Sequence, residues 1–380
     1  MSLFLVTFIA IYASVHIYIL RRIKLAFSLG PAAWSGIAFF MLLMICTPVA
    51  IRFSERVGYE ILARFLAYTG YAWMGLVFVL FTAQLPVDLY RLAILIFSRR
   101  IQSLSRWQLT AKTAFMAPLF LALAINLYGY FEANNIRLEK VVIRTNKLPD
   151  RHTGLRLAQI SDVHLGLQVR QERLKKIIAA VSRAEPDLLV ATGDLVDGQL
   201  NNLTGLAELL SAVRPRYGKF AVTGNHEYYA GISQSLAFLE AAGFKVLQDE
   251  GLTIDQTFNL AGVNDKAGGY FGMVPSQNAA TLLAGLPTDR FTIFLRHRPV
   301  IEEETAGLFD LQLSGHTHNG QIFPFNLITR LSFPIWSGLT PLDNGANIYV
   351  SRGTGTWGPM IRFLAPPEVT LFEIVPQGRP

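Results

Sequence analysis

Residues 155–194 read "LRLAQISDVHLGLQVRQERLKKIIAAVSRAEPDLLVATGD", and this stretch decides the fold of the second half of the chain. It begins with a short apolar segment that ends in acidic and imidazole groups. Residues 171–186 have the apolar period of a helix. Residues 186–194 form a near-continuous apolar run that ends in Gly-Asp, as buried strands do. A strand, a helix and a second strand in this order predict an α/β domain.

The same pattern continues beyond residue 194. An amphipathic helix is expected at 233–244, closed by Gly243. Short apolar runs that end in polar residues recur at 219–227, 291–299, 310–318 and 347–355. In α/β sheets, ligand-binding groups gather just past the carboxyl ends of the strands. We therefore expect the polar residues at these strand ends to lie close together.

Those strand ends carry most of the histidines of the chain. Five of the seven lie there, two of them in "LSGHTHNG" (313–320). The candidate residues are Asp162, His164, Asp194, Asn225, His226, His297, His316 and His318. Carboxylate oxygen combined with imidazole nitrogen is a ligand set for Zn, Mn or Fe, whereas Ca prefers oxygen alone. The set is too large for one ion and suits two ions about 3.5–4 Å apart.

Each of these motifs has an ordinary interpretation when it stands alone. Asp162 is suited to cap a helix, Gly193-Asp194 and Asn225-His226 are common in turns, and His297 is suited to a core position. Their joint occurrence, each at the end of an expected strand, favours a metal centre. Asp197 is expected to lie in a turn or to support the ligands without binding a metal itself.

Several segments of the soluble half also resemble a known family. "SDVHLG", "TGDLVDG", "TGNHEYY", "RHRP" and "GHTHNGQ" resemble the signature blocks of calcineurin-like metallophosphoesterases. The segment "YVSRGTGTWGPMIRFLAPPEVTLFEI" is similar to the C-terminal part of the YkuE/YaeI-type branch, in which relatives with several N-terminal membrane spans occur. The resemblance covers residues 140–376 and implies a two-sheet β-sandwich flanked by helices. It departs from the usual pattern at Asn319, where the family has glycine.

The resemblance also implies roles for the candidate residues. Asp162, His164 and His318 would hold one metal ion, while Asn225, His297 and His316 would hold the other, with Asp194 bridging the two. A hydroxide formed between the metals would attack phosphorus in line. His226 would not ligate, but would protonate the leaving oxygen or stabilise its charge. Arg296, Arg298 and Arg352 are candidates to neutralise the phosphate oxygens, although each is also suited to an exposed surface.

The first half of the chain has the composition of a membrane domain. Uncharged apolar runs cover residues 1–20, 32–51, 66–86 and 113–131, and the third run extends past Pro86 towards Phe97. A transmembrane helix needs about 20 such residues. We predict about four transmembrane helices in a domain of residues 1–135, followed by a metallophosphoesterase domain of residues 136–380. Alternatives are a fifth span at 87–97 and a cleavable signal in the first run, although that run is followed by its charges instead of preceded by them.

Charge divides the chain at the same place. Residues 1–140 carry a net charge of +8 and the remainder −1, so the basic residues accompany the apolar runs. This distribution is typical of loops that flank membrane spans, and it argues against a nucleic-acid surface. The loops after the first and third apolar runs carry slightly more Lys and Arg than the loop after the second run. Loops rich in Lys and Arg tend to lie in the cytoplasm, which predicts an extracytoplasmic catalytic domain after four spans. The single cysteine, Cys46, lies in an apolar run and excludes an intrachain disulfide.

The motifs leave the substrate open. A catalytic domain tethered to a bilayer favours a phosphate mono- or diester or a diphosphate on a lipid. One alternative is a UDP-diacylglucosamine-type pyrophosphate hydrolase, which requires a cytoplasmic site. An alternative of another class is a metal-stabilised binding module of a transport or assembly protein. Residues 262–277 are expected to form either a flexible lid with Tyr270, Phe271 and Met273 meeting acyl chains, or a loop tucked onto the sheet.

Overall fold

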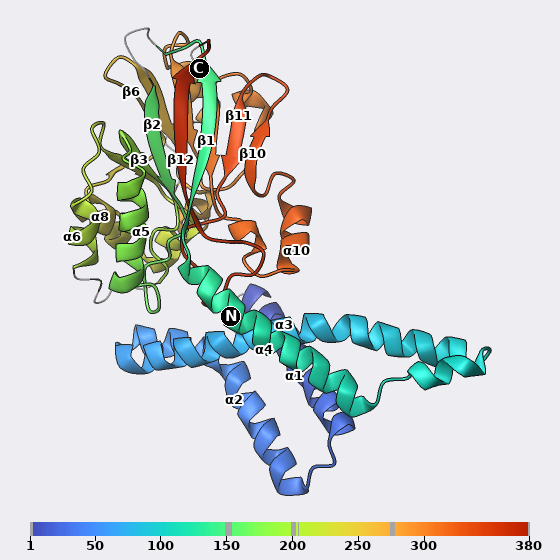
Figure 1. Cartoon of the computed structure of the whole chain (residues 1–380). Helices are drawn as coiled ribbons and strands as arrows, with labels where there is room; N and C mark the ends of the chain where they lie inside the picture. Colours follow the sequence, from blue (N-terminus) through green and yellow to red (C-terminus); the bar gives the residue numbers. More distant parts are fainter. Residues whose placement is uncertain (1–2, 149–153, 199–202, 204, 274–277, 379–380) are drawn as a thin grey trace. The chain divides into compact units, whose positions relative to one another are not determined.

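The structure is a computed structural model, and it describes residues 3–148, 154–198, 203, 205–273 and 278–378. The chain forms two compact units (Figure 1). One comprises Met1–Phe131 with Gly358–Ile361, and the other comprises Glu132–Trp357 with Arg362–Pro380. Each unit has its own packing and is described separately.

The described part of the first unit is built from four long helices. They are α1 (Leu3–Ala26), α2 (Pro31–Arg56), α3 (Glu60–Ser98) and α4 (Ala111–Asn134), with a short 3-10 helix, η1 (Gln102–Trp107), before α4. All four are long and apolar enough to cross a membrane. The predicted number of about four is confirmed. Residues 87–97 do not form a separate span, because α3 runs through Pro86 as one helix of 39 residues.

Polar side chains link α1 to α3 inside this unit. The Asp88 carboxylate of α3 accepts hydrogen bonds from Tyr18 and Arg22 of α1. It also accepts a 3.2 Å bond from Gln84 Nε2, one helical turn earlier. A charge among apolar helices is costly unless it is paired, and these contacts supply its partners.

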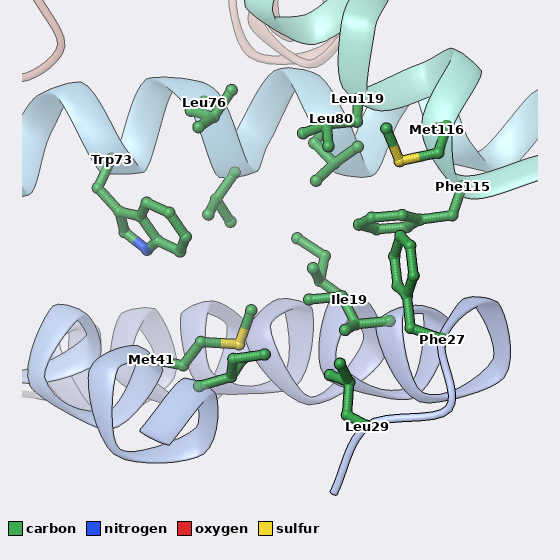
Figure 2. Close-up of a pocket in the computed structure, with 13 residues that line it drawn as sticks. Ile19, Phe27, Leu29, Met41, Trp73, Leu76, Leu80, Phe115, Met116 and Leu119 are labelled. Carbon is green, nitrogen blue, oxygen red and sulfur yellow. The ribbon is translucent and has the colours of Figure 1, made fainter. Parts of the chain in front are cut away.

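An apolar cavity of about 410 Å³ lies among the same helices (Figure 2). Side chains from all four helices line it, and Figure 2 shows Met41, Trp73 and Phe115 among them. Its lining is apolar apart from the indole N–H of Trp73, which already donates to His16 Nε2 at 2.9 Å. The cavity is therefore suited to hydrocarbon and not to a polar solute or an ion.

The described residues of the second unit form two six-stranded mixed sheets. The first sheet has the order β1-β12-β2-β3-β4-β5, and the second has the order β10-β11-β9-β8-β7-β6. The strands of the first are β1 (Arg137–Thr145), β2 (Leu155–Ile160), β3 (Leu188–Thr192), β4 (Lys219–Val222), β5 (Lys245–Val246) and β12 (Glu368–Pro376). Those of the second are β6 (Glu250–Ile254), β7 (Phe258–Gly262), β8 (Phe291–Leu295), β9 (Leu311–Ser314), β10 (Gly338–Pro341) and β11 (Asn347–Val350).

The two sheets pack face to face and helices cover their outer sides. The shared core includes Leu157, Val190 and Phe220 of the first sheet with Ile293 and Leu313 of the second. On the other side of the first sheet lie α5 (Gln171–Arg183), α6 (Leu206–Ser211) and α8 (Ile232–Ala241) (Figure 1). Helix α9 (Ala279–Ala284) packs on the second sheet. The predicted two-sheet sandwich flanked by helices is confirmed.

The direction of the central strands decides where the polar motifs meet. Strands β2, β3 and β4 are mutually parallel, as are β7, β8 and β9. Parallel strands bring all their carboxyl ends to one edge of a sheet. The loops that follow β2, β3, β4, β8 and β9 therefore converge at one edge of the sandwich.

Candidate metal centre

The candidate ligands occupy those converging loops in an unusual backbone conformation. Asp162, His164, Asp194, His316 and His318 all have positive φ, between 50° and 71°. Left-handed backbone is uncommon for residues other than glycine and is concentrated at functional sites. The loops thus hold the side chains in a strained backbone conformation, and the packing of their buried surroundings keeps that conformation in place.

Two glycines allow the loops to approach one another. A Cβ atom on Gly224 would lie 2.2 Å from Asp194 Oδ1, and one on Gly315 would lie 1.9 Å from Ser161 Oγ. Both distances are shorter than any contact between non-bonded atoms. Glycine is therefore required where the loop after β4 meets the loop after β3, and where the loop after β9 meets the loop after β2.

One group of ligand atoms comes from Asp162, His164 and His318. The Nε2 atoms of His164 and His318 are 3.0 Å apart, and His318 Nε2 is 3.4 Å from Asp162 Oδ1. All three side chains are buried. Two imidazole nitrogens and a carboxylate oxygen that converge in this way form a donor set suited to a divalent transition metal.

A second group comes from Asp194, His297 and His316. His297 Nε2 lies 3.2 Å from Asp194 Oδ2 and 3.2 Å from His316 Nδ1. Asp194 also belongs to a third group, with His164 and His226, whose ligand atoms lie within 4.8 Å of one another. Asp194 and His164 therefore connect neighbouring groups, as residues between two metal positions would.

The remaining ring nitrogens fix the orientation of two imidazoles. His297 Nδ1 donates to the backbone oxygen of Thr192 at 2.8 Å, which leaves Nε2 free to face Asp194. His226 Nδ1 lies 3.0 Å from both the backbone oxygen and the carboxylate Oδ1 of Asp197. Such contacts fix the tautomer of a histidine in a metal site. They agree with the supporting role expected for Asp197.

Buried carboxylates dominate the electrostatics of the centre. Burial alone would lower the pKa of His297 and His226, but the negative charge of Asp194, with that of Asp162 near His297 and of Asp197 near His226, raises the two pKa values to about 10 and about 9 respectively. The pKa of Asp194 is held well below its usual range because the positive imidazoles outweigh the effect of burial. Asp194 thus stabilises positive charge on His297 and His226 although both rings are buried, whereas burial and neighbouring positive charges lower the pKa of His316 and His318. The residues present fit a pair of divalent cations.

Asn225 and the three candidate arginines differ in their surroundings. Asn225 Oδ1 is 3.4 Å from Arg298 Nη2, and Arg298 Nη1 is 3.1 Å from His316 Nε2. Arg298 therefore lies against the candidate ligands. The side chain of Arg296 instead pairs with Glu302, and that of Arg352 pairs with Glu139 and Glu368.

Three supporting residues were not identified from the sequence. Glu227 is fully buried, and its carboxylate accepts backbone N–H bonds from Asp194, Leu195, Val196 and Gly224, which ties the loops after β3 and β4 together. Asp265 pairs with Arg298 at 2.8 Å. Arg362, also fully buried, donates to the backbone oxygen of His318 and lies 3.2 Å from His318 Nδ1.

Aromatic side chains surround the centre. The ring centroids of Tyr229 and Trp357 lie 5.4 and 6.2 Å from that of His226, and Phe333 lies 5.3 Å from His316. In the expected lid, Phe271 ends the 3-10 helix η2 (Lys266–Phe271) and packs on Tyr228 and Tyr229. Tyr270 and Met273 are exposed, and residues 274–277 lie outside the described residues.

Comparisons with known proteins identify the family. Residues 155–320 match the model of the calcineurin-like phosphoesterase family. The chain is 30% identical over 376 residues, 96% of each chain, to an uncharacterized metallophosphoesterase of Campylobacter jejuni. It is 32% identical over 266 residues to a transmembrane protein with metallophosphoesterase domain from Danio rerio, covering 66% of this chain and 60% of the fish protein.

A relative in the predicted branch was also found. The chain is 29% identical over 284 residues to the uncharacterized metallophosphoesterase YkuE of Bacillus subtilis, covering 70% of this chain and 97% of that protein. The motifs, the sandwich and these relatives agree with one another. The chain belongs to the calcineurin-like metallophosphoesterase family and is a metal-dependent phosphohydrolase.

Proposed function

We propose that the chain is a membrane-anchored phosphoesterase with a dinuclear metal centre, acting on a phosphate ester or diphosphate bond of a lipid-linked substrate. The membrane domain would comprise residues 1–135 and the catalytic domain residues 136–380. The observation that carries the proposal is the chain of overlapping ligand groups, in which Asp194 is shared by two and His164 by two. A single ion would need only one of these groups.

The ligand roles in this proposal are those of the family motifs, and the grouping of the carboxylate and imidazole atoms supports them. Asp162, His164 and His318 would hold one cation, while Asn225, His297 and His316 would hold the other, and Asp194 would be shared. When bound, two such cations lower the pKa of a water molecule and neutralise phosphate oxygens. The donor set accepts Mn, Fe or Zn.

The chain's own side chains carry the rest of the reaction. His226 donates a proton to the leaving oxygen, and its contact with Asp197 at 3.0 Å supports this role because it engages Nδ1 and leaves Nε2 as the nitrogen that can transfer the proton. Arg298 contributes positive charge to the phosphate oxygens, supported by its position against His316 and Asn225. The contacts of Arg296 and Arg352 with carboxylates do not favour a role at the phosphate.

Metal removal tests the proposal directly. Full-length protein in detergent is treated with chelator and then resupplied with Mn²⁺, Zn²⁺ or Fe²⁺, and hydrolysis of bis-p-nitrophenyl phosphate is followed with metal content per chain. We expect chelation to abolish turnover and resupply to restore it as two ions bind. Ca²⁺ is the control that should not restore it, because imidazole is a poor ligand for Ca²⁺. Restoration with one ion per chain would contradict the dinuclear centre.

The side of the membrane decides between two substrate classes. The loop charges support a catalytic domain outside the cytoplasm, whereas a nucleotide-linked lipid substrate requires the cytoplasmic side. We expect a cysteine at the exposed Thr288, in a Cys46→Ala background, to react with a membrane-impermeant maleimide in intact spheroplasts. Reaction only after lysis would place the domain in the cytoplasm and favour the UDP-diacylglucosamine-type alternative.

A further inference from the structure

The helix α10 (Phe325–Ser332) presents its apolar side chains to the outside of the catalytic unit. Its one buried residue is Thr329, whereas Leu327, Ile328 and Leu331 are 50%, 55% and 87% exposed. A helix on a water-soluble domain normally turns its apolar side inward. In α10 the polarity is reversed.

The exposed residues form one continuous stripe. Leu331 stands four residues after Leu327 and three residues after Ile328, so the three side chains lie on one face of the helix. Covering each of these side chains with apolar material would contribute roughly 1.5–3 kcal/mol. Leaving the stripe in water forgoes that energy, so the arrangement favours an apolar partner.

Two further apolar residues are exposed close to the start of the helix. Phe323, 40% exposed, precedes α10, and its backbone N–H donates to Phe363 at 3.1 Å, next to Leu364. Leu364 is 62% exposed and has a φ of 56°. Left-handed backbone is unfavourable for a bulky residue. The backbone thus accepts local strain at a position that holds an exposed leucine.

The charge around α10 matches a lipid surface. From Leu311 to Leu342, Arg330 is the only Lys, Arg, Asp or Glu, and it stacks on Trp336 with 4.1 Å between the guanidinium carbon and the ring centroid. An apolar stripe flanked by a cation and a tryptophan is typical of helices that lie in the membrane interface. A water-facing protein surface would carry more charges of both signs.

Chain connectivity identifies the bilayer as the partner. Two residues separate the end of α4 at Asn134 from the start of β1 at Arg137. The catalytic unit is therefore tethered directly to a helix that is long and apolar enough to span a membrane. We propose that the α10 surface, defined as Phe323, Leu327, Ile328, Leu331 and Leu364, inserts into the lipid interface of that same bilayer.

The α10 surface is also connected to the metal centre. Phe333, directly after α10, contacts His316, and a Cβ atom on Gly320 would lie 2.3 Å from the backbone nitrogen of Asn326. Gly320 ends the 3-10 turn η4 (His318–Gly320), which begins with a candidate ligand. Insertion of α10 would therefore hold the centre at the level of lipid phosphate groups. This positioning of the metal centre at lipid phosphate groups rests on the proposed function, whereas the insertion of α10 does not.

A depth measurement tests the insertion. Full-length protein in the Cys46→Ala background carries an environment-sensitive fluorophore on Leu331→Cys and is reconstituted at one chain per nanodisc, with nitroxide-labelled phospholipid or with iodide in the water. Thr288→Cys is the matched control, because Thr288 is exposed and lies just before β8, at the opposite end of the strands from the centre. We expect lipid nitroxide to quench the Leu331 probe at least about twofold more than the control probe, and iodide to quench it less, since interfacial helices bury their apolar face about 5–10 Å deep.

Two results would overturn the proposal. Equal iodide quenching at both positions would place the α10 surface in water. Protection of the Leu331 probe from both quenchers would mean that protein covers it, either another part of this chain or a partner.

A kinetic experiment tests the link to turnover. The double variant Ile328→Ser, Leu331→Ser is compared with wild type on phosphatidyl-p-nitrophenol in nanodiscs and on soluble bis-p-nitrophenyl phosphate, which share a leaving group. We expect KM for the lipid to rise at least about tenfold, which needs the loss of only about 1.4 kcal/mol of interfacial binding, with the soluble reaction unchanged. Unchanged kinetics on both substrates would separate insertion from catalysis. If wild type hydrolyses neither substrate while the Leu331 probe lies in lipid, the proposed function fails and the membrane surface stands.

Discussion

The Asp194→Asn variant will bind at most one divalent cation per chain and lose at least about 10³-fold in turnover. Asp194 is shared by two of the three ligand groups, and its negative charge holds the pKa of His297 and His226 above their usual value. Asparagine keeps the size and the Oδ1 atom that accepts from the backbone of His226 at 2.8 Å, but it removes the charge. Losing one cation removes several kcal/mol of transition-state stabilisation, and about 4 kcal/mol corresponds to about 10³-fold.

Metal analysis and kinetics on the same sample measure this effect. Asp310→Asn is the matched control, because Asp310 also accepts a backbone hydrogen bond, from Thr292 at 2.8 Å, but it precedes β9 and so lies at the opposite end of the strand from the centre. It should keep two ions and full turnover. An Asp194→Asn protein that retained two ions and wild-type kinetics would show that Asp194 does not lie between metals.

The His226→Ala variant is expected to keep both metal ions while its kcat falls by about 10²- to 10⁴-fold, the range for loss of a general acid. The expectation rests on the contacts of His226 with Asp197, which orient the ring, and on the remaining residues, which suffice for two ions.

In contrast, Arg298→Lys keeps the charge beside Asp265 but loses the planar fork, so its KM should rise about tenfold with a smaller change in kcat.

The division between kcat and KM distinguishes proton transfer from substrate binding, and Arg296→Lys serves as the control because Arg296 pairs with Glu302. His226 itself belongs to one of the ligand groups, so the experiment must also distinguish a metal ligand from a general acid. Loss of a metal ion from His226→Ala would therefore make His226 a ligand and remove it from the role of acid.

The sequence was informative where function depends on local pattern. Asp162, Asp194 and His316 each follow an apolar strand, so their convergence at one edge followed from the parallel sheet alone. The four apolar helices were equally visible, because a bilayer sets their length and composition.

Long-range partners could not be predicted in the same way. Arg352 pairs with Glu139, 213 positions earlier in the chain, so no local pattern distinguishes it from a substrate-binding arginine. Glu227 looks like an ordinary helix-start residue, and its role depends on backbone N–H groups of a different loop. The reversed polarity of α10 is likewise invisible without knowing which side of the helix is covered.

The position of β12 has a consequence for biosynthesis. This strand is the last in sequence, yet it lies between β1 and β2, pairing with β1 in parallel and with β2 in antiparallel register. The apolar helices leave the ribosome before either sheet and can enter the bilayer early, but the first sheet stays divided until residues 368–376 have been translated. During that interval β1 and β2 each expose an unpaired edge, which is the condition under which strands recruit wrong partners. Synthesis at the membrane, which keeps each β1 close to its own ribosome, would limit that risk for a catalytic domain that is completed only by its final strand.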